Sequence, residues 1–535
     1  MDDGIGSGRT AAVRLIRGTP LTEALDPADP RAWTAFDVGV RQILRYGHAL
    51  LPEKERTAVL RSGTTDNAAP QSETSALHPA TGRSDRLRRW VTARFRRPAE
   101  SSEPAAGLGR LPHGRPRADG VRGGSGGPDA RARLALALCH PDGRVREAAL
   151  KRVARHPILL PLLVIRTGDR VVPVRERARR LLGERLDVET AVVLAPLILR
   201  VGRRDRGAVG LELLDGVLRR APRERLLPLH THTDRTVRRF ALRLALEEGI
   251  LSPGELARRA AWDDDAVVQG LCADAALAAL TDGGDWDEVL EPLLGARNAR
   301  ARSAGVTALR RAGRPERAVG FLADRSAVVR ACARYVVRQH GTDPLPWYRK
   351  RCADPADPAV PPGAVIGLAE CGERADAELL WPLLTHPAPA VRARAVAGLR
   401  ILDVTDVARL LPLLDDPAPG VVRKTTTVLL SFAGTLPDGL LMTRLGAERS
   451  RSVRVAAFRL LDARGGLIGL RAAVALLNDP DDKLRTWAGQ SVQRWRPGAD
   501  TPHGNPEVGE LLDRARHLFS DYVLQRRKWE AGLTG

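Results

Sequence analysis

Apolar residues recur along the chain at helical spacing and at a fixed repeat length. A Val-Arg or Leu-Arg pair opens successive helical patterns, and Arg392, Arg423, Arg454 and Arg485 are each 31 residues apart. An alanine stands four residues after the apolar member of most pairs, and a larger apolar residue stands four residues further on. Positions i, i+4 and i+8 share one face of an α-helix, so each pattern predicts a helix with a buried face and a close approach to its neighbour at the alanine.

The same pair recurs upstream, at Arg330, Arg238, Arg175 and Arg146. One degenerate copy falls at Pro361, and weaker copies are expected near Gly207, Val268 and Arg302. Counting all copies predicts an all-α chain of about twelve helix pairs over residues 130–497.

The turns before these helices carry a family resemblance. The strings DPDDKLR (479–485), HPAPAVR (386–392) and HPDGRVR (140–146) resemble the Asp-Pro-x-x-x-Val-Arg turn of HEAT repeats. The resemblance implies a right-handed α-α superhelix in which each helix pair contacts only its neighbours.

The resemblance also implies a hydrogen-bonded ladder of Asp and Arg side chains along the turns. Asp169, Asp324 and Asp479 are the expected carboxylates, whereas His at 140, 232 and 386 replaces Asp in other turns. The expected ladder arginines are Arg146, Arg175, Arg238, Arg330, Arg392, Arg423, Arg454 and Arg485.

The regions outside the repeats divide into three segments. Residues 1–61 hold one helical pattern, in which Trp33, Phe36 and Val40 share a face, and the preceding GIGSGR stretch is interpreted as a flexible terminus. Residues 62–129 are rich in Ser, Thr, Pro, Gly and Ala, which predicts a disordered linker. Residues 506–531 are expected to form a single amphipathic helix that caps the stack.

Composition adds two constraints. Apolar residues make up 43% of the chain and aromatic residues only 4%, a balance that suits close-packed helices. The formal charge is +21, but only six of the 85 basic residues are Lys, a skew that codon bias explains as well as a binding surface does. The five cysteines occur singly, and the longest apolar run (158–165) is short and interrupted by proline, so we expect a soluble, cytoplasmic protein with free thiols.

The sequence offers no catalytic centre, metal site or cofactor site. No phosphate-binding loop motif is present, and none of the 11 His residues is followed by Glu, as the iron-binding deoxyhypusine hydroxylases of similar fold would require. His230 and His232 could be drawn as a metal site with Asp234, but positions i and i+2 point to different sides of a helix. Trp262 and the three acids after it are interpreted as packing beside a solvated turn.

Two basic features are candidate binding surfaces. Residues 84–97 fit a short basic amphipathic helix that would contact nucleic acid, a partner's groove or an anionic membrane face, and the alternative is a solvated linker. The second feature is a basic side chain six residues after the Val or Leu of several repeats; in HEAT arrays this helix lines the concave surface. The candidate residues are Arg86, Arg88, Arg89, Trp90, Arg94, Arg96 and Arg97 in the segment, and Lys151, Arg180, Arg243 and Arg459 in the repeats.

These observations favour a non-enzymatic scaffold or adaptor that binds a protein partner along its superhelix. A solenoid that binds nucleic acid through its basic residues is the alternative. The sequence does not identify the partner.

Overall fold

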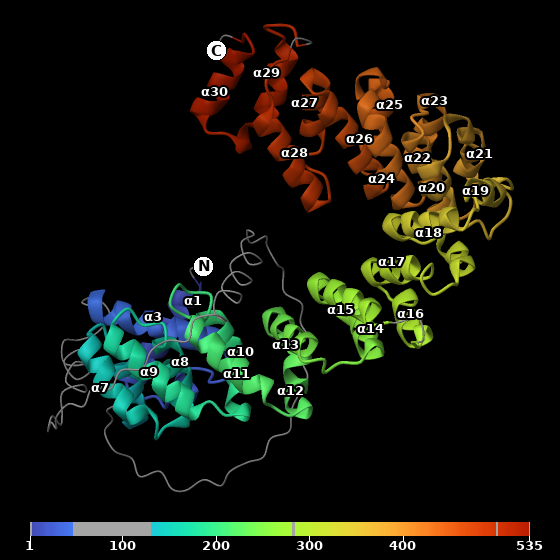
Figure 1. Cartoon of the computed structure of the whole chain (residues 1–535). Coiled ribbons are helices and arrows are strands. Elements are labelled where there is room, and N and C mark those ends of the chain that lie inside the picture. The colour runs from blue at the N-terminus through green and yellow to red at the C-terminus, as the bar shows by residue number, and fades with distance from the viewer. Residues whose placement is uncertain (1–2, 47–129, 281–283, 499–500, 534–535) are drawn as a thin grey trace. The chain divides into compact units, whose positions relative to one another are not determined.

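The computed structural model describes residues 3–46, 130–280, 284–498 and 501–533, and every regular element in these ranges is helical (Figure 1). The chain divides into two compact units, residues 1–252 and 253–535. Each unit is a stack of helix pairs of the HEAT type, in which a first element is followed by a turn and a second helix.

The described residues of the first unit form three N-terminal helices and four helix pairs. The N-terminal helices are α1 (Asp3–Ile16), α2 (Leu21–Ala24) and α3 (Pro30–Tyr46). The pairs are α6 (Ala130–Leu138) with α7 (Gly143–Val153), α8 (Leu160–Arg166) with α9 (Val172–Arg185), α10 (Val188–Val201) with α11 (Ala208–Arg219), and α12 (Arg223–His230) with α13 (Arg235–Glu247).

The second unit contains eight pairs and a closing pair. Its second helices are α15 (Ala266–Ala278), α17 (Ala299–Ala308), α18 (Ala327–Gln339), α20 (Pro362–Cys371), α22 (Pro389–Ile401), α24 (Pro419–Leu429), α26 (Arg451–Arg464) and α28 (Asp482–Arg494). Their first elements are α14 (Pro253–Trp262), α16 (Trp286–Leu294), the 3-10 helix Pro315–Phe321, α19 (Leu345–Cys352), α21 (Ala377–Leu380), α23 (Val407–Leu410), α25 (Asp438–Met442) and α27 (Gly466–Ala475). Before the closing pair, the described residues therefore contain the twelve pairs that the repeat count predicts.

The alanine positions explain how the second helices stack. Ala178, Ala333, Ala395 and Ala457 are fully buried, and α22 packs directly on α24 as α24 does on α26. A side chain no larger than a methyl group lets adjacent helices approach to the short end of the usual 8–10 Å. Thr426 occupies the same place in α24 and is also buried, with its hydroxyl donating to the carbonyl of Val422.

The N-terminus differs from the sequence-based interpretation, because the GIGSGR stretch lies inside α1. Gly8 of α1 and Gly39 of α3 meet where the two helices cross: a Cβ on Gly8 would lie 2.1 Å from the carbonyl oxygen of Ala35. The missing side chains therefore permit a backbone-to-backbone contact, which buries Trp33 and Phe36. The apolar face predicted for residues 33–44 does pack into the first unit, against α8 and α10.

The C-terminal helix expected over residues 506–531 is two helices, so that prediction is wrong. The structure has α29 (Pro506–Arg514) and α30 (Asp521–Glu530), and Ser520 caps α30 by accepting a hydrogen bond from the Val523 backbone. The break moves Tyr522 out of the apolar face, and it is 76% exposed.

Residues 62–129, predicted as a linker, lie outside the described residues, as does the 84–97 segment with Arg86, Arg88, Arg89, Trp90, Arg94, Arg96 and Arg97. None of the described helices combines the length and apolar character needed to cross a bilayer.

Candidate binding surface

The turns of the stack are joined by an arginine ladder. Arg392 donates two hydrogen bonds to the Asp416 carboxylate of the next repeat, at 2.7 and 2.8 Å, and a third to the carbonyl of His386 in its own turn, at 2.8 Å. A planar guanidinium satisfies both turns at once because its donors have a fixed fork geometry. The same links to the next repeat are Arg146 with Asp169, Arg302 with Asp324, and Arg454 with Asp479.

The structure places the other expected ladder residues in related positions. Arg175, Arg330 and Arg485 donate to the carbonyls of Asp169, Asp324 and Asp479, whose carboxylates are bound by the arginine of the preceding repeat. Arg238 donates to the His232 carbonyl at 2.8 Å. Arg423 is exposed, and no described carboxylate lies within ion-pair distance of it.

The degenerate repeat at Pro361 is bridged by a residue that the sequence did not indicate. Arg330 pairs with Glu370, which lies on α20, and Arg334 donates to the same carboxylate at 2.9 Å. Glu370 therefore supplies, from a helix, the negative charge that a turn aspartate supplies elsewhere. Similarly, Gln269 replaces an arginine and donates to the Asp263 carbonyl at 2.8 Å.

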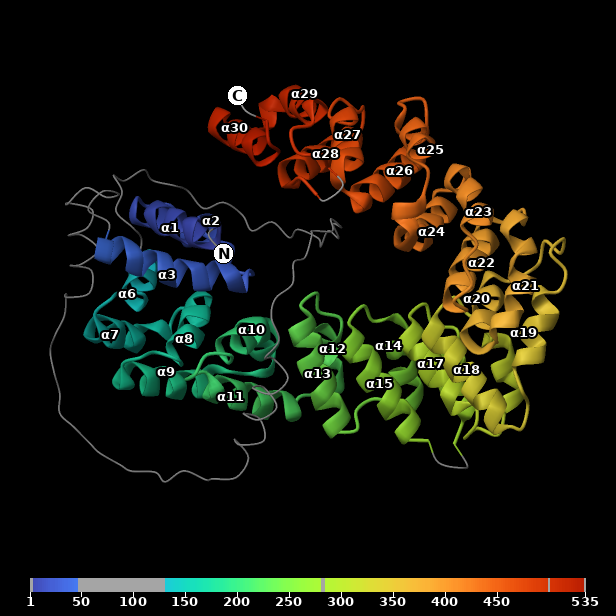
Figure 2. The same cartoon turned by 90° about the horizontal axis from the view of Figure 1, so that it is seen from above.

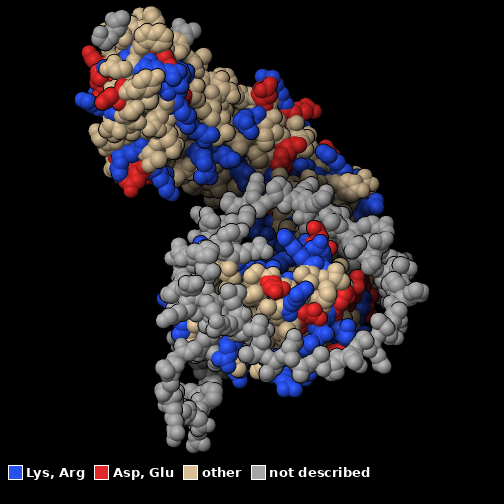
Figure 3. All heavy atoms as spheres, turned by 90° about the vertical axis from the view of Figure 1, so that its left-hand side faces the viewer, with Lys and Arg blue, Asp and Glu red and all other residues tan. Residues whose placement is uncertain are grey.

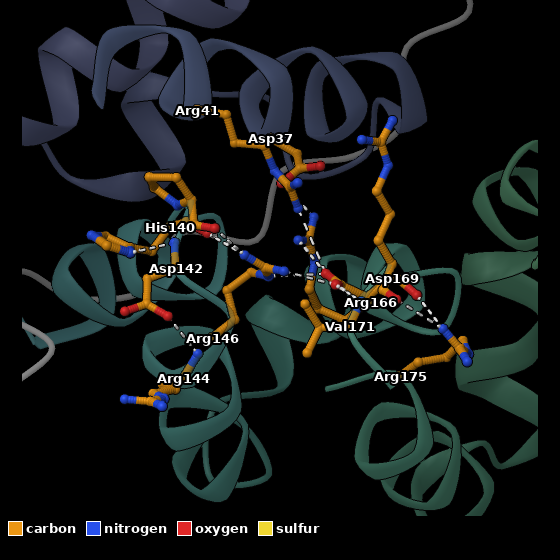
Figure 4. Close-up of polar contacts among 12 residues, drawn as sticks. Asp37, Arg41, His140, Asp142, Arg144, Arg146, Arg166, Asp169, Val171 and Arg175 are labelled. Carbon is orange, nitrogen blue, oxygen red and sulfur yellow. Dashed lines mark hydrogen bonds and ion pairs between the residues drawn. The ribbon is translucent and has the colours of Figure 1, made fainter. Parts of the chain in front are cut away.

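A buried charge cluster ties the N-terminal helices to the ladder in the first unit (Figure 4). Arg166 of α8 is 1% exposed and pairs with Asp37 of α3 and, at 3.0 Å, with Asp169. Asp169 also accepts two hydrogen bonds from Arg146, at 2.8 and 2.9 Å. Charges removed from water in this way are stable only when each has a partner, so α3 and the first two repeats depend on one another.

These contacts shift the pKa values of the ladder carboxylates. Burial alone would raise the pKa of Asp169, but the hydrogen bonds from Arg146 and the Val171 backbone, with the charge of Arg166, lower it below its ordinary value. The same balance lowers the pKa of Asp324 beside Arg302 and of Glu370 beside Arg330. All three carboxylates are therefore harder to protonate in the folded chain than in the unfolded chain.

Acidification should consequently unfold the protein. A carboxylate with a lowered folded pKa contributes stability that is present above its unfolded pKa, about 3.9 for Asp and 4.3 for Glu, and that is lost as the pH falls further through the folded pKa. We expect the thermal midpoint, followed by circular dichroism, to hold from pH 7 to about pH 5 and to fall steeply below about pH 4. A midpoint unchanged at pH 3 would contradict this assignment of the ladder.

From α20 to α28, the second helices of the second unit lie on the inner side of a curved row, and the first elements α21, α23 and α25 lie outside them (Figure 2). Four consecutive repeats place a cation on this inner face. Each cation is placed relative to the ladder arginine of its own helix, which is Arg392, Arg423, Arg454 or Arg485. Arg394 lies two residues after its ladder arginine, Lys424 lies one residue after, Arg459 lies five residues after, and Lys483 lies two residues before. At 3.6 residues per turn these positions fall within about 100° of the helix circumference. We call Arg394, Lys424, Arg459 and Lys483 the inner cationic row.

The inner cationic row is not neutralised within the described part of the chain. Lys424, Arg459 and Lys483 are exposed and Arg394 is half-buried, and no described carboxylate pairs with any of them. Helices α22 and α24 contain no Asp or Glu at all. The acids of α26 and α28 are already engaged, Asp462 by Ser491 and Asp482 by Arg485. Lys and Arg side chains gather in a band on the C-terminal unit, the upper body in Figure 3.

The candidate cations of the first unit lie on a surface that carries both basic and acidic side chains. Lys151 and Arg180 are exposed on α7 and α9, but Arg243 is half-buried and pairs with Asp215 at 3.3 Å and with Glu247 at 3.6 Å. Acids on the same helices face these cations, and Arg177 of α9 reaches Glu147 of α7 at 3.7 Å. The structure thus brings Arg459 into an unpaired row and leaves Lys151 and Arg180 as separate exposed charges.

The other residues singled out in the sequence, His230, His232 and Trp262, lie at helix ends or in a turn. His230 is buried, whereas the ring of His232 accepts a hydrogen bond from the Asp234 backbone in its turn. The interpretation of Trp262 as a packing residue is wrong, because its side chain is 73% exposed at the end of α14, with Arg297 over its ring. Within the described residues no three His, Cys, Asp or Glu side chains are grouped as a metal would require.

No family model matches the sequence, and no curated protein is similar to it. Among solved structures, importin beta aligns with a TM-score of 0.32 and 14% identity, over 75% of this chain and 64% of that one. Kap121p aligns with a TM-score of 0.25 and 13% identity, over 91% of this chain and 53% of that one. This chain therefore spans less than two thirds of the length of either protein. A TOG-domain array of a microtubule polymerase, from a study of tubulin recruitment, aligns with a TM-score of 0.21 and 11% identity, over 68% of this chain and 89% of that one.

Proposed function

We propose that this protein is a non-enzymatic scaffold or adaptor that binds a protein partner along the inner face of its helical repeats. The observation that carries the proposal is the inner cationic row, an exposed and unneutralised surface shared by four consecutive repeats. Repeat stacks suit this role because adjacent units build one extended surface from many helices.

The chemistry of the polar groups supports binding rather than catalysis. The ladder carboxylates Asp169, Asp416 and Asp479 are held by arginines in the turns, away from the inner face. Burial raises the pKa of Cys272 and Cys352 to about 12, which keeps these thiols protonated and poorly nucleophilic. All five cysteines are free thiols, which favours a reducing compartment such as the cytoplasm.

Nucleic acid is the second candidate partner, because the same row is basic and the chain carries a formal charge of +21. Phosphate contacts would release counterions and make binding fall steeply with salt. The 84–97 segment remains a prediction for either partner.

A comparative capture experiment tests the proposal. The full chain, the row variant R394Q/K424Q/R459Q/K483Q and the matched control K350Q/R374Q/R514Q/R516Q, which removes equal charge from exposed positions outside the second helices, are immobilised and exposed to lysate with and without nuclease. We expect the wild type and the control to retain the same proteins after nuclease treatment and the row variant to lose them. Retention of the same proteins by the row variant, or loss of all ligands after nuclease treatment, would contradict the proposal.

A further inference from the structure

The positive charge and the spacing of the inner cationic row indicate what kind of ligand it can bind. Resting on the scaffold function above, we propose that the row binds an extended, acidic peptide segment of the protein partner, with carboxylates spaced about three residues apart.

The four cations of the row have no described carboxylate within ion-pair distance. In the same repeats, three arginines at other positions are paired: Arg444 with Asp415, Arg464 with Asp438, and Arg471 with Glu507. Arg400 and Arg423 are exposed there without a described carboxylate partner. The acids on the helices of the row, Asp462 of α26 and Asp482 of α28, bond to Ser491 and Arg485, so the row keeps a positive charge that can attract a negative ligand.

Small side chains separate the cations. Ala393 and Ala397 flank Arg394 on α22, Thr427 follows Lys424 on α24, and Ser452 precedes Arg459 on α26. Such a surface allows a peptide backbone to lie close to the helices, so that its side chains reach the basic groups on either side. Among the large apolar side chains of α22, α24, α26 and α28, only Ile401 is exposed, at 49%, whereas an amphipathic helix would call for several large apolar contacts.

The spacing of the repeats matches an extended chain. Packed helices, as α22, α24 and α26 are, lie about 8–10 Å apart, and an extended peptide advances about 3.3 Å per residue, so that three residues span one repeat among these helices. A segment that crosses the second helices therefore meets one cation for every third side chain. The four positions span seven residues of helix register, about 10 Å along the helix axis, which is within the reach of Lys and Arg side chains.

A nucleic acid fits this row less well. A duplex carries one charge per about 1.7 Å, so one cation per repeat would leave most phosphates without a partner. Surfaces for single strands add aromatic side chains on which bases stack. The row has none: Trp487 of α28 is half-buried against Phe458, with ring centroids 4.6 Å apart.

The test uses the full chain and fluorescent peptides of equal length. One peptide carries a glutamate at every third position, a second carries the same glutamates in one block, and a third replaces them with lysine; an oligothymidine of equal charge is the fourth probe. We expect the periodic acidic peptide to bind most tightly, with an affinity that falls as salt is raised. The row variant R394Q/K424Q/R459Q/K483Q should bind it at least about tenfold more weakly, because it lacks four charge pairs, and K350Q/R374Q/R514Q/R516Q should bind it as the wild type does.

Three results would overturn the inference: equal affinity of wild type and row variant, equal affinity for the periodic and blocked peptides, or tighter binding of the oligothymidine. Matching thermal midpoints of the variants exclude unfolding as the cause of lost binding. If the capture experiment returns a row-dependent protein while the acidic peptides do not bind, the scaffold function stands and only the acidic, extended partner is rejected. Capture of no row-dependent protein rejects the scaffold function itself.

Discussion

Replacing Asp169 by alanine is expected to lower the free energy of unfolding of the first unit by about 3–5 kcal/mol, because the change leaves two buried guanidinium groups without their shared carboxylate. Arg146 is 3% exposed and Arg166 is 1% exposed, so water cannot replace the lost partner. The carboxylate of Asp169 also accepts a hydrogen bond from the Val171 backbone at 3.0 Å, which the alanine variant loses as well. Hydrogen exchange of α7, α8 and α9, measured by mass spectrometry in increasing urea, reports the loss within this unit.

Glu147→Ala is the matched control, since it removes the same charge from the same unit. Glu147 is half-buried on α7 and lies 3.7 Å from Arg177, an ion pair open to solvent. Such a pair contributes about 0–1 kcal/mol. If the two variants open α7–α9 at the same urea concentration, the buried cluster does not hold the N-terminal helices to the repeats.

The regular parts of the repeats could be predicted from the sequence because they depend on local spacing. The buried alanine, the Val-Arg pair and the turn residue follow from one helical period and one repeat length, and they located the ladder. The partner of Arg330 could not be found in this way. Glu370 is 40 residues away and on a helix, so only the packing of α20 brings it to the site.

Only one residue of the inner cationic row, Arg459, was predicted from the sequence. The position six residues after the apolar residue of each repeat is a single site per helix, and it includes Arg459 but neither Lys424 nor Lys483. An exposed helix face covers about 100°, which includes several positions per turn. The available signal was the complete lack of Asp and Glu in α22 and α24.

In the N-terminal helices, the glycine-rich composition of residues 4–9 leads to a wrong prediction. Glycine weakens an isolated helix, so a glycine-rich stretch such as residues 4–9 favours a flexible interpretation. Here the crossing of α1 and α3 requires glycine at two facing positions, and the buried contact with Trp33 and Phe36 offsets the low helix propensity. Facing glycines on two separate helices leave no periodic signal in a single sequence.

Gly8→Ala should therefore separate α1 from α3. The added methyl group would lie 2.1 Å from the carbonyl oxygen of Ala35, a backbone atom that cannot turn aside. Moving the helices apart exposes Ala12 and Leu15, which are fully buried, and overpacking of this kind costs about 1–3 kcal/mol or more. Faster tryptic cleavage at Arg9 and Arg14, with the rest of the first unit still folded, is the expected measurement.

Gly6→Ala is the decisive comparison, because it makes the same change two residues away in the same helix. Nothing lies within 4 Å of a Cβ on Gly6, so the substitution only raises helix propensity and should stabilise α1 by about 0.5–1 kcal/mol. The two alanine variants should thus shift cleavage in opposite directions. Equal slowing of cleavage in both would mean that helix propensity, and not the contact between Gly8 and α3, sets the stability of the N-terminal helices.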